Sequence, residues 1–284
     1  MNERLALIGF GEAGATFGGA AGWKDRACAF DIEPSRIAAM DEAGIPAASD
    51  MQAALADATL ALSVVTADQA LAVAQACAEF LRPGALFCDM NSVAPETKKA
   101  AAAAIEAKGG RYVDVAVMAP VNPKKLAVPL FLSGPHAEAA RVALGDAGFT
   151  DLRIVGDEVG RASTIKMLRS VMYKGVEALT AECLVACERA GVTEEVLGSF
   201  GNDWATGADY RLDRMLVHGV RRAAELREVC KTLEDLGLPA RMSSGTVAWE
   251  QQFGDLNIAP VPDGLESKLD AVARKLGFAR KEKA

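Results

Sequence analysis

The sequence predicts an α/β protein whose N-terminal domain alternates strands with helices and whose C-terminal domain is all-α. Short apolar runs alternate with helix-like stretches up to about residue 157. Such alternation is typical of βαβ units around a mostly parallel sheet. After Gly160 strand-like runs nearly vanish and one long helical stretch follows. We therefore expect domains at 1–157 and 158–284, joined by a long interdomain helix.

Composition limits the classes of protein to which the chain can belong. Its 284 residues are 51% hydrophobic and 24% charged, which is enough apolar material for a packed core. The formal net charge of −7 makes it a poor candidate for a nucleic-acid binder, because neutralising phosphates needs a basic excess. The sequence shows no signal-peptide pattern, and no uncharged apolar stretch reaches about 18 residues. We expect a cytoplasmic protein without a membrane span.

The six cysteines do not form the pattern of a metal site or a disulfide framework. None belongs to a Cys-x-x-Cys pair, and only two histidines, His136 and His218, could complete a metal site. Cys183 and Cys187 lie four residues apart, so they share a face of a predicted helix. We interpret them as buried helix residues in a reducing compartment, and we expect no metal.

The first strand–helix–strand unit opens at the N-terminus. Residues 5–8 form an apolar run that ends in glycines, and the small apolar residues of 13–22 suit a helix packed closely on a sheet. A second strand is predicted over 27–30 and ends at Asp31. A helix over 34–43 follows, and its first residue is a proline, which suits the first turn.

The same alternation continues to residue 155. Further strands are predicted from short apolar runs at 59–65, 85–90, 112–117, 130–133 and 152–155. Helices are predicted between them at 67–80, at 95–107 and from His136 onward. The second of these helices is rich in Ala and Lys and closes at a pair of glycines. With helices between parallel strands, we expect both faces of the sheet to be covered.

The C-terminal part is predicted to be helical throughout. A helix over 163–190 has a length of about 40 Å at 1.5 Å per residue, which is long enough to join two domains. Shorter helices are predicted at 193–200, 212–236 and 240–252. The segment 201–210 carries glycines and aspartates and is expected to be loop-like.

Gly9-Phe10-Gly11-Glu12-Ala13-Gly14 is a GxGxxG motif between a predicted strand and a predicted helix. Gly9 permits the tight turn, Gly11 lets the backbone approach a pyrophosphate, and Gly14 allows close helix–strand packing. We expect the diphosphate on the free N–H groups at the start of the helix, where Glu12 and Ala13 lie. The alternative is a glycine turn that merely joins strand to helix. The context favours a Rossmann dinucleotide-binding domain.

An acidic residue stands where such a domain binds the ribose. Asp31 lies 22 residues after Gly9, at the end of the second predicted strand. A carboxylate there accepts hydrogen bonds from the ribose hydroxyls and repels a 2′-phosphate, which favours NAD over NADP. Arg36 lies close by in the sequence and could soften that repulsion, so some use of NADP stays open.

Four segments follow one another in an order that is more specific than any one of them. They are GFGEAG at the N-terminus, Asp89-Met90-Asn91-Ser92-Val93-Ala94-Pro95, Tyr112-Val113-Asp114-Val115-Ala116-Val117, and Gly156-Asp157-Glu158-Val159-Gly160 followed by Lys166. In this order they resemble the β-hydroxyacid dehydrogenases, the group that contains 3-hydroxyisobutyrate dehydrogenase and 6-phosphogluconate dehydrogenase. The resemblance covers residues 4 to about 190 and is thinner after that. It indicates a divergent subgroup with a poorly characterised C-terminal domain.

The resemblance implies a catalytic lysine. Lys166 matches the family's general acid/base, and hydride can leave a carbinol carbon only as the O–H proton is taken up. The alternative for Lys166 is a surface position on a long helix. The resemblance assigns Ser92 to orienting the substrate, unless it caps the helix that begins near Pro95. It assigns Thr66 and Asn91 to cofactor binding.

The chain departs from the family at three places. Ser170 stands where the family has an asparagine, four residues after the lysine, and is expected to face the substrate. Met118-Ala119-Pro120 replaces the S-G-G loop that grips a substrate carboxylate, and Ala224 replaces a later lysine. Lys174 and Arg222 are candidate replacements as binders of an anionic substrate group. The alternative for the basic cluster on the later helix is a solvated face with an ordinary Arg–Glu pair.

Together these features predict an NAD-dependent oxidoreductase that transfers a hydride between a small polar hydroxy compound, such as a hydroxy acid, and the nicotinamide. Two alternatives stay open: an imine or semialdehyde reductase on the same fold, and a non-catalytic NAD-binding redox sensor. We expect a homodimer, as in the family, with ligands at the carboxyl ends of the strands in a cleft between the domains. No nucleic acid, membrane or metal partner is expected.

Overall fold

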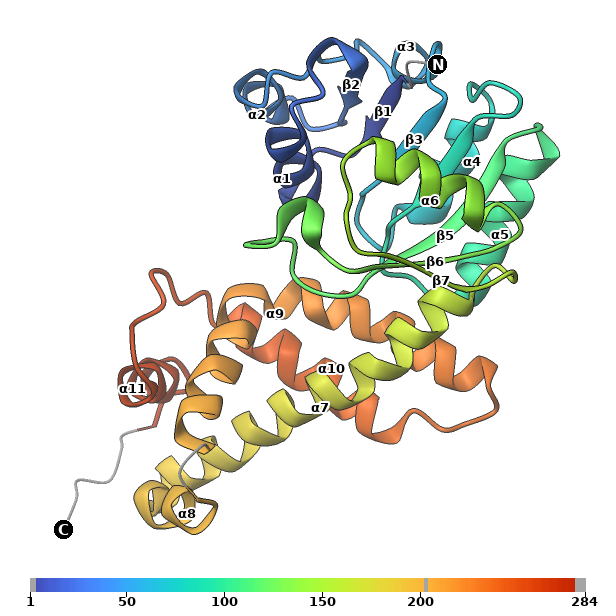
Figure 1. Cartoon of the computed structure of the whole chain (residues 1–284). Helices are drawn as coiled ribbons and strands as arrows, with labels where there is room; N and C mark the ends of the chain where they lie inside the picture. The colour runs from blue at the N-terminus through green and yellow to red at the C-terminus, as the bar shows by residue number, and fades with distance from the viewer. Residues whose placement is uncertain (1–3, 202–203, 279–284) are drawn as a thin grey trace. The chain divides into compact units, whose positions relative to one another are not determined.

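The computed structural model describes residues 4–201 and 204–278. The chain forms two compact units, an α/β unit up to Met167 and a helical unit from Leu168 onward (Figure 1). The predicted fold class is confirmed. The units divide inside helix α7 (Arg161–Ala190), whereas the boundary predicted near residue 157 lies just before this helix. That residues 1–157 serve the cofactor and 158–284 the substrate remains a prediction.

The first unit is built on a seven-stranded sheet. The strands stand in the order β2 (Ala27–Phe30), β1 (Leu5–Ile8), β3 (Leu60–Ser63), β4 (Leu86–Asp89), β5 (Arg111–Val117), β6 (Leu130–Ser133) and β7 (Leu152–Gly156). Neighbouring strands from β2 through β5 are parallel. β6 runs antiparallel to β5 and parallel to β7. Each strand lies where the sequence predicts one, and only the ends differ.

Helices cover both faces of this sheet, as predicted (Figure 1). One face carries α1 (Glu12–Ala21), α2 (Arg36–Glu42) and α6 (Ala137–Asp146), and the other carries α3 (Met51–Leu55), α4 (Ala70–Ala78) and α5 (Pro95–Ala107). Successive residues of a strand point to opposite faces. Leu5 and Leu7 therefore pack against Phe17 of α1, whereas Ala6 and Ile8 pack in the opposite layer. Short 3₁₀ turns occur at Lys24–Arg26 and Lys125–Ala127.

Helix α3 was not predicted from the sequence. It is little more than one turn long, too short to show an apolar period. Its start is fixed by Asp50, whose Oδ1 accepts a hydrogen bond from the N–H of Ala53 at 2.8 Å.

The sheet brings several strand ends together at one edge. The last residues of β1, β2, β3 and β4 are in register, since Ile8 pairs with both Phe30 and Ser63 and Ser63 pairs with Asp89. The loops that follow these strands therefore leave the sheet side by side. Ligands of parallel α/β sheets bind beyond such carboxyl ends. The candidate site residues of the first unit come from these loops and from the start of α7.

The second unit consists of helices. It holds most of α7, together with α8 (Thr193–Ser199), α9 (Trp204–Asp235), α10 (Arg241–Asp255) and α11 (Leu265–Lys275). Its core includes Leu184, Leu212, Met215, Phe253 and Leu269, all of them buried. No helix among residues 4–201 and 204–278 is long and apolar enough to cross a membrane.

Close packing of α9 on α10 depends on two glycines. A Cβ added at Gly219 would lie 2.3 Å from the carbonyl oxygen of Glu250, and one at Gly254 would lie 2.5 Å from the amide nitrogen of Val220. Neither position has room for a side chain, so the two backbones approach directly.

In this unit one expectation was wrong and one helix was not predicted. The segment 201–210 was expected to be loop-like, but α9 begins at Trp204 and continues through it. Residues 202 and 203 lie outside the described part. Helix formation here follows from packing, since Ala208 and Leu212 are fully buried and tertiary context outweighs the low propensity of glycine and aspartate. Helix α11 was missed, although Leu269 and Val272 give it a buried apolar face.

Candidate active site

The glycine-rich loop between β1 and α1 has the geometry that a dinucleotide needs. Gly9 has φ of +95°, a conformation that favours glycine. A Cβ at Gly14 would lie 2.4 Å from the carbonyl oxygen of Gly9, so this position has no room for one. A Cβ at Gly11 would meet nothing within 4 Å. The conformation and packing of the chain therefore explain Gly9 and Gly14. Gly11 instead leaves open space over the loop, where a ligand fits.

The start of helix α1 offers backbone donors beside that open space. Its N-cap residue is Gly11, and no side chain of the described residues caps it. The N–H of Ala15 is bonded to the carbonyl of Gly11 at 2.9 Å, as in a regular helix. The N–H groups of Glu12 and Ala13 precede that bond and have no intrahelical acceptor. Such donors, with the positive end of the helix dipole, fit a diphosphate.

Asp31 follows β2 and is bound to the glycine-rich loop. Its Oδ2 accepts from the N–H of Phe10 at 2.6 Å and its Oδ1 accepts from the N–H of Glu33 at 2.9 Å. The side chain is only partly buried, so further oxygen lone pairs remain open to a ribose hydroxyl. Loop, helix start and carboxylate together fit a dinucleotide.

The two other residues assigned to cofactor binding differ in their surroundings. Thr66 is exposed after β3. Hydrogen bonds from Gln69 and then from the Thr66 hydroxyl lower the pKa of Asp68. Asn91 is buried after β4, and its amide joins two strand ends: Oδ1 accepts from the N–H of Val65 at 2.7 Å, and Nδ2 donates to Ser63 Oγ at 3.0 Å. The Asn91 amide thus has a structural task, and cofactor contacts of Asn91 and Thr66 stay predictions.

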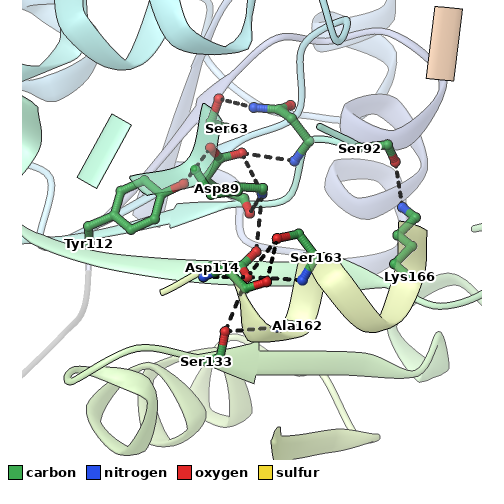
Figure 2. Close-up of polar contacts among 12 residues, drawn as sticks. Ser63, Asp89, Ser92, Tyr112, Asp114, Ser133, Ala162, Ser163 and Lys166 are labelled. Atoms are coloured by element: carbon green, nitrogen blue, oxygen red, sulfur yellow. Dashed lines mark hydrogen bonds and ion pairs between the residues drawn. The ribbon is translucent and has the colours of Figure 1, made fainter. Parts of the chain in front are cut away.

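Ser92 and Lys166, which we call the serine–lysine pair, lie together in the first unit. The Nζ of Lys166 donates to the Oγ of Ser92 at 2.5 Å (Figure 2). Both side chains are partly buried. Lys166 is therefore not a fully exposed surface lysine. Ser92 is not a helix cap either, because the N-cap of α5 is Ala94 and no side chain of the described residues caps it.

In the same unit a buried cation lies between two buried carboxylates, an arrangement that we call the Asp–Lys–Asp bridge. Lys98 Nζ lies 3.0 Å from Asp89 Oδ1 and 3.5 Å from Asp114 Oδ1, and it donates to the carbonyl oxygen of Asp89 at 2.6 Å. The hydroxyl of Tyr112 donates to Asp89 Oδ2 at 2.7 Å. Burial, followed by the charge of Asp89, raises the pKa of Tyr112 well above its usual value, so this hydroxyl stays a donor.

Asp114 also holds the start of α7 (Figure 2). Its Oδ2 accepts from the N–H of Gly160 at 3.2 Å, from the N–H of Ser163 at 3.0 Å and from the Ser163 hydroxyl at 3.1 Å. Ser133 Oγ donates to the same oxygen at 3.1 Å and accepts from the N–H of Ala162 at 2.9 Å. A carboxylate that accepts the first N–H groups of a helix stabilises that helix end.

Sequence reasoning missed the Asp–Lys–Asp bridge. Asp89 and Asp114 were quoted only as letters of two motifs, and Lys98 was lost in an Ala- and Lys-rich helix. The one available signal was register: Asp89 ends its strand, and Asp114 sits midway along the next, among apolar neighbours. An acidic residue inside a buried strand requires a partner.

The segment that replaces the S-G-G loop, residues 118–120, follows β5 and carries no polar side chain. Met118 is buried against Ala116 and Ala162, and its N–H donates to the carbonyl of Pro129 at 2.9 Å. Further on, Asn122 Nδ2 donates to Thr16 Oγ1 at 3.3 Å, which ties this segment to α1. The Met118 side chain thus belongs to the core.

The remaining predicted residues lie in the second unit, where two of them hold ion pairs. Lys174 Nζ lies 2.7 Å from Glu225 Oε2, and Arg222 contacts both Glu177 and Glu250. Burial lowers the pKa of Lys174, although Glu225 opposes the shift. The carboxylates already balance both cations, so an anionic substrate group would have to compete with them. Their substrate binding stays a prediction.

Ser170 is also in this unit, four residues after Lys166 on α7, and is partly buried. The Arg–Glu pair considered as an alternative is present, since Arg221 Nη1 lies 2.7 Å from Glu225 Oε1. Cys183 and Cys187 share a helix face as predicted, with their sulfurs 3.9 Å apart. No cluster of three or more potential ligands occurs among the described residues that could hold a metal ion.

Two parts of the chain match known protein families. Residues 4–143 match the NAD binding domain of 6-phosphogluconate dehydrogenase, and residues 187–253 match a domain of unknown function (DUF1932). A conserved hypothetical protein from Sinorhizobium meliloti 1021 is 37% identical, with a TM-score of 0.75 and 97% of both chains covered. A conserved protein described as structurally similar to 3-hydroxyacid dehydrogenases is 31% identical, with a TM-score of 0.69, over 89% of this chain and 97% of its own.

The fold is shared more widely. The 3-hydroxyisobutyrate dehydrogenase of Mycobacterium tuberculosis, whose structure is known with L-serine, is 17% identical with a TM-score of 0.72, over 96% of this chain and 100% of its own. At that identity the likeness concerns the fold alone. The first unit is thus an NAD(P)-binding domain. The chain belongs to the β-hydroxyacid dehydrogenase family of oxidoreductases, in a divergent subgroup whose C-terminal part is the domain of unknown function.

Proposed function

We propose that this protein is an NAD-dependent oxidoreductase that interconverts a small polar hydroxy compound, such as a hydroxy acid, and its carbonyl product. The observation that carries the proposal is the serine–lysine pair, with Lys166 Nζ 2.5 Å from Ser92 Oγ in the same unit as the dinucleotide loop. A lysine amine held by a serine hydroxyl can exchange a proton with a substrate hydroxyl.

Each residue has a defined task in this proposal. A dinucleotide held by the glycine-rich loop and Asp31 would supply the hydride acceptor for the carbinol carbon. Lys166, in its neutral form, takes the proton that the substrate hydroxyl loses, and in the reverse direction it returns that proton to the carbonyl oxygen. Ser92 orients the amine and presents a second hydrogen-bonding group to the same oxygen.

The preference for NAD rests on Asp31. Its carboxylate is fixed beside the glycine-rich loop by the N–H of Phe10. A 2′-phosphate placed near it would meet a negative charge, whereas ribose hydroxyls would find an acceptor. Arg36, the first residue of α2, is a cation close by in the sequence that could offset this effect.

The substrate differs from those held by an S-G-G loop. Met118-Ala119-Pro120 offers no hydroxyl, and its proline offers no N–H. We therefore place the substrate among small polar hydroxy compounds whose anionic group is held elsewhere or is absent. A cytoplasmic location remains a prediction from the sequence.

We further propose a homodimer formed through the second unit. Its helices expose apolar side chains that a lone domain would ordinarily bury. They include Met172 (67% exposed), Leu179, Val217, Val220 and Met242. Exposed apolar surface of this kind marks interfaces. Sedimentation velocity should give twice the 29.7 kDa chain mass, and Met172→Glu should shift the equilibrium towards monomer. A monomer at micromolar concentration would contradict this part.

The test of function is a turnover assay of the purified protein with NAD and with NADP. Absorbance of the reduced nicotinamide would be followed against 3-hydroxy acids, sugar acids and aryl 1,3-diols, and in reverse against semialdehydes and imines. Lys166→Ala is assayed in parallel. Oxidation of one hydroxy class with NAD, lost in the variant, is the expected result.

Other outcomes separate the alternatives. Turnover with imines but with no hydroxy compound would establish a reductase. Tight NAD binding without turnover on any substrate would favour a redox sensor. Equal turnover by Lys166→Ala would overturn the assigned proton transfer.

A further inference from the structure

One buried cation has no task in the proton transfer described above. Lys98 lies on α5 with none of its side chain exposed. Its neighbour Lys99 is half exposed and pairs with Glu96 in the ordinary manner of a helix surface. A buried lysine loses its hydration and requires compensation, so its position between Asp89 and Asp114 points to a task in this site.

Asp89, at one end of the Asp–Lys–Asp bridge, is hydrogen-bonded to the residue that precedes Ser92. Asp89 Oδ1, which faces Lys98, also accepts from the N–H of Asn91 at 3.0 Å. Asn91 is held in turn by Ser63 and Val65 of the neighbouring strand and its loop. The residue that directly precedes Ser92 therefore has its main chain and its side chain fixed.

Asp114, at the other end, is hydrogen-bonded to the turn of α7 that precedes Lys166. Asp114 faces Lys98 with Oδ1, while its Oδ2 accepts both the N–H and the hydroxyl of Ser163. Ser163 lies in the first turn of α7, and Lys166 follows it by three residues, one turn on. These hydrogen bonds hold the turn of α7 that precedes Lys166 against Asp114 (Figure 2).

We propose that Lys98 is a positioning residue: it draws Asp89 and Asp114 together and so sets Ser92 and Lys166 at hydrogen-bond distance. Without the cation, two buried carboxylates would repel one another and move apart. This inference rests on the proposed function, since the pair that it positions is the one assigned to proton transfer.

Three variants separate positioning from mere charge balance. Lys98→Met removes the bridge and leaves two uncompensated carboxylates, so it can fail to fold. Lys98→Met combined with Asp114→Asn also lacks the bridge, but it restores the original net charge of the cluster, and the asparagine oxygen can still accept from Ser163. Lys99→Met removes the adjacent exposed lysine and is the matched control.

Two measurements are made on each folded variant. The first is kcat and KM on the substrate that the wild type turns over, together with the Kd for NADH. The second needs no substrate: the rate at which trinitrobenzenesulfonate labels the Lys166 amine, read by peptide mass spectrometry. We expect kcat to fall about 100-fold in the variants that lack the bridge, with a small change in KM. Labelling of Lys166 should accelerate about three- to tenfold as the Ser92 hydrogen bond is lost.

The charge-balanced variant decides the question. If it recovers thermal stability while kcat stays low and Lys166 stays reactive, Lys98 positions the pair. If stability, kcat and labelling all return to the wild-type values, Lys98 only balances charge and the proposal is overturned. If neither bridge variant folds, Asp114→Asn alone is measured, and wild-type kcat and labelling in it would also overturn the proposal. If the wild type turns over no substrate but labelling of Lys166 still changes in the bridge variants, Lys98 positions the pair and the proposed function is overturned instead.

Discussion

Lys166 Nζ lies 2.5 Å from Ser92 Oγ, although 74 residues separate them in the sequence. Ser92 lies in the loop that leaves the carboxyl end of β4, and Lys166 lies in the second turn of α7. Asn91, next to Ser92, donates to Asp89, and Ser163 of α7 donates to Asp114. Lys98 lies between these two buried carboxylates and so connects the two segments. The lysine to which we assign the proton transfer is thereby placed beside the edge of the sheet where the dinucleotide loop lies.

Removal of the serine hydroxyl should slow the reaction while leaving the fold intact. Ser92→Ala is expected to lower kcat about 10- to 100-fold, the effect of one hydrogen bond to a charged group. Ser92→Thr keeps the hydroxyl and should retain most of the activity. Steady-state kinetics and a thermal melt of both variants provide the measurement. A normal kcat in Ser92→Ala would remove the serine from the mechanism.

Two glycine variants should separate cofactor binding from folding. Gly11→Ala places a methyl in open space, so unfolding free energy should stay within about 1 kcal/mol of the wild type. The methyl would lie where the diphosphate approaches, so the Kd for NADH should rise at least about tenfold.

Gly14→Ala should behave in the opposite way. Its Cβ would lie 2.4 Å from the carbonyl oxygen of Gly9. This contact should destabilise the protein by about 1–3 kcal/mol. Chemical denaturation and NADH titration of both variants test the pair. Unchanged NADH affinity in Gly11→Ala would mean that the diphosphate does not lie over this residue.

Asp31 should determine the choice between the two dinucleotides. Asp31→Ser removes the carboxylate, and the ratio of the Kd for NADP to that for NAD should fall at least about tenfold. Both constants are expected to rise, because the bond to the N–H of Phe10 is lost as well. Asp41→Ser, at an exposed position on α2, is the control and should leave the ratio unchanged. A constant ratio in Asp31→Ser would place the discrimination elsewhere.

The buried carboxyl of Glu250 should give the second unit an unusual pH dependence. Burial raises the pKa of Glu250 above its usual value near 4.5, an effect only partly opposed by Arg222. Other charged groups that act on it are Lys174 on α7 and Glu225 on α9. Glu177 on α7 contacts the same arginine, Arg222. One Glu250 oxygen, Oε2, has no hydrogen-bond partner in the described part of the chain.

The raised pKa of Glu250 determines whether stability rises or falls with pH. When folding raises the pKa of a carboxyl group, the protonated group stabilises the folded state at pH values below its unfolded-state pKa. This stabilisation is lost as the pH rises through the folded-state pKa. Glu250→Gln should therefore gain melting temperature relative to the wild type between about pH 4.5 and neutrality. Glu234→Gln, at an exposed site, should show a flat difference. A difference that falls with pH for Glu250→Gln would show that the buried charge is favourable.

Much of the fold could be predicted because local patterns agree with tertiary structure in the first unit. Strands β1 and β2 lie at the predicted residues, since a short apolar run that ends in glycine or aspartate is typical of a buried parallel strand. The prediction of a loop at residues 204–210 was wrong for the opposite reason. Glycine and aspartate suggest a loop, but burial of Ala208 against the helical core decides in favour of a helix.

The candidate site was predictable where a motif carries it and not where packing does. Gly9, Asp31 and Lys166 each stand at a recognisable spacing. Lys98 could not be found, because adjacent lysines on one helix look alike in sequence and only the fold shows that one is buried and the other exposed. The ion pair of Lys174 likewise depends on a partner 51 residues away.

The most direct test of the proposed mechanism is the rate of a single hydride transfer as a function of pH. Wild type and Lys166→Met, each preloaded with NAD, would be mixed with the substrate found in the turnover assay from about pH 5 to about pH 10. The mechanism predicts a wild-type rate that follows the titration of one group. It predicts a variant about 100- to 10,000-fold slower in which that titration is absent. A variant with the wild-type rate and the wild-type pH profile would contradict the assignment of Lys166 as the group that moves the proton.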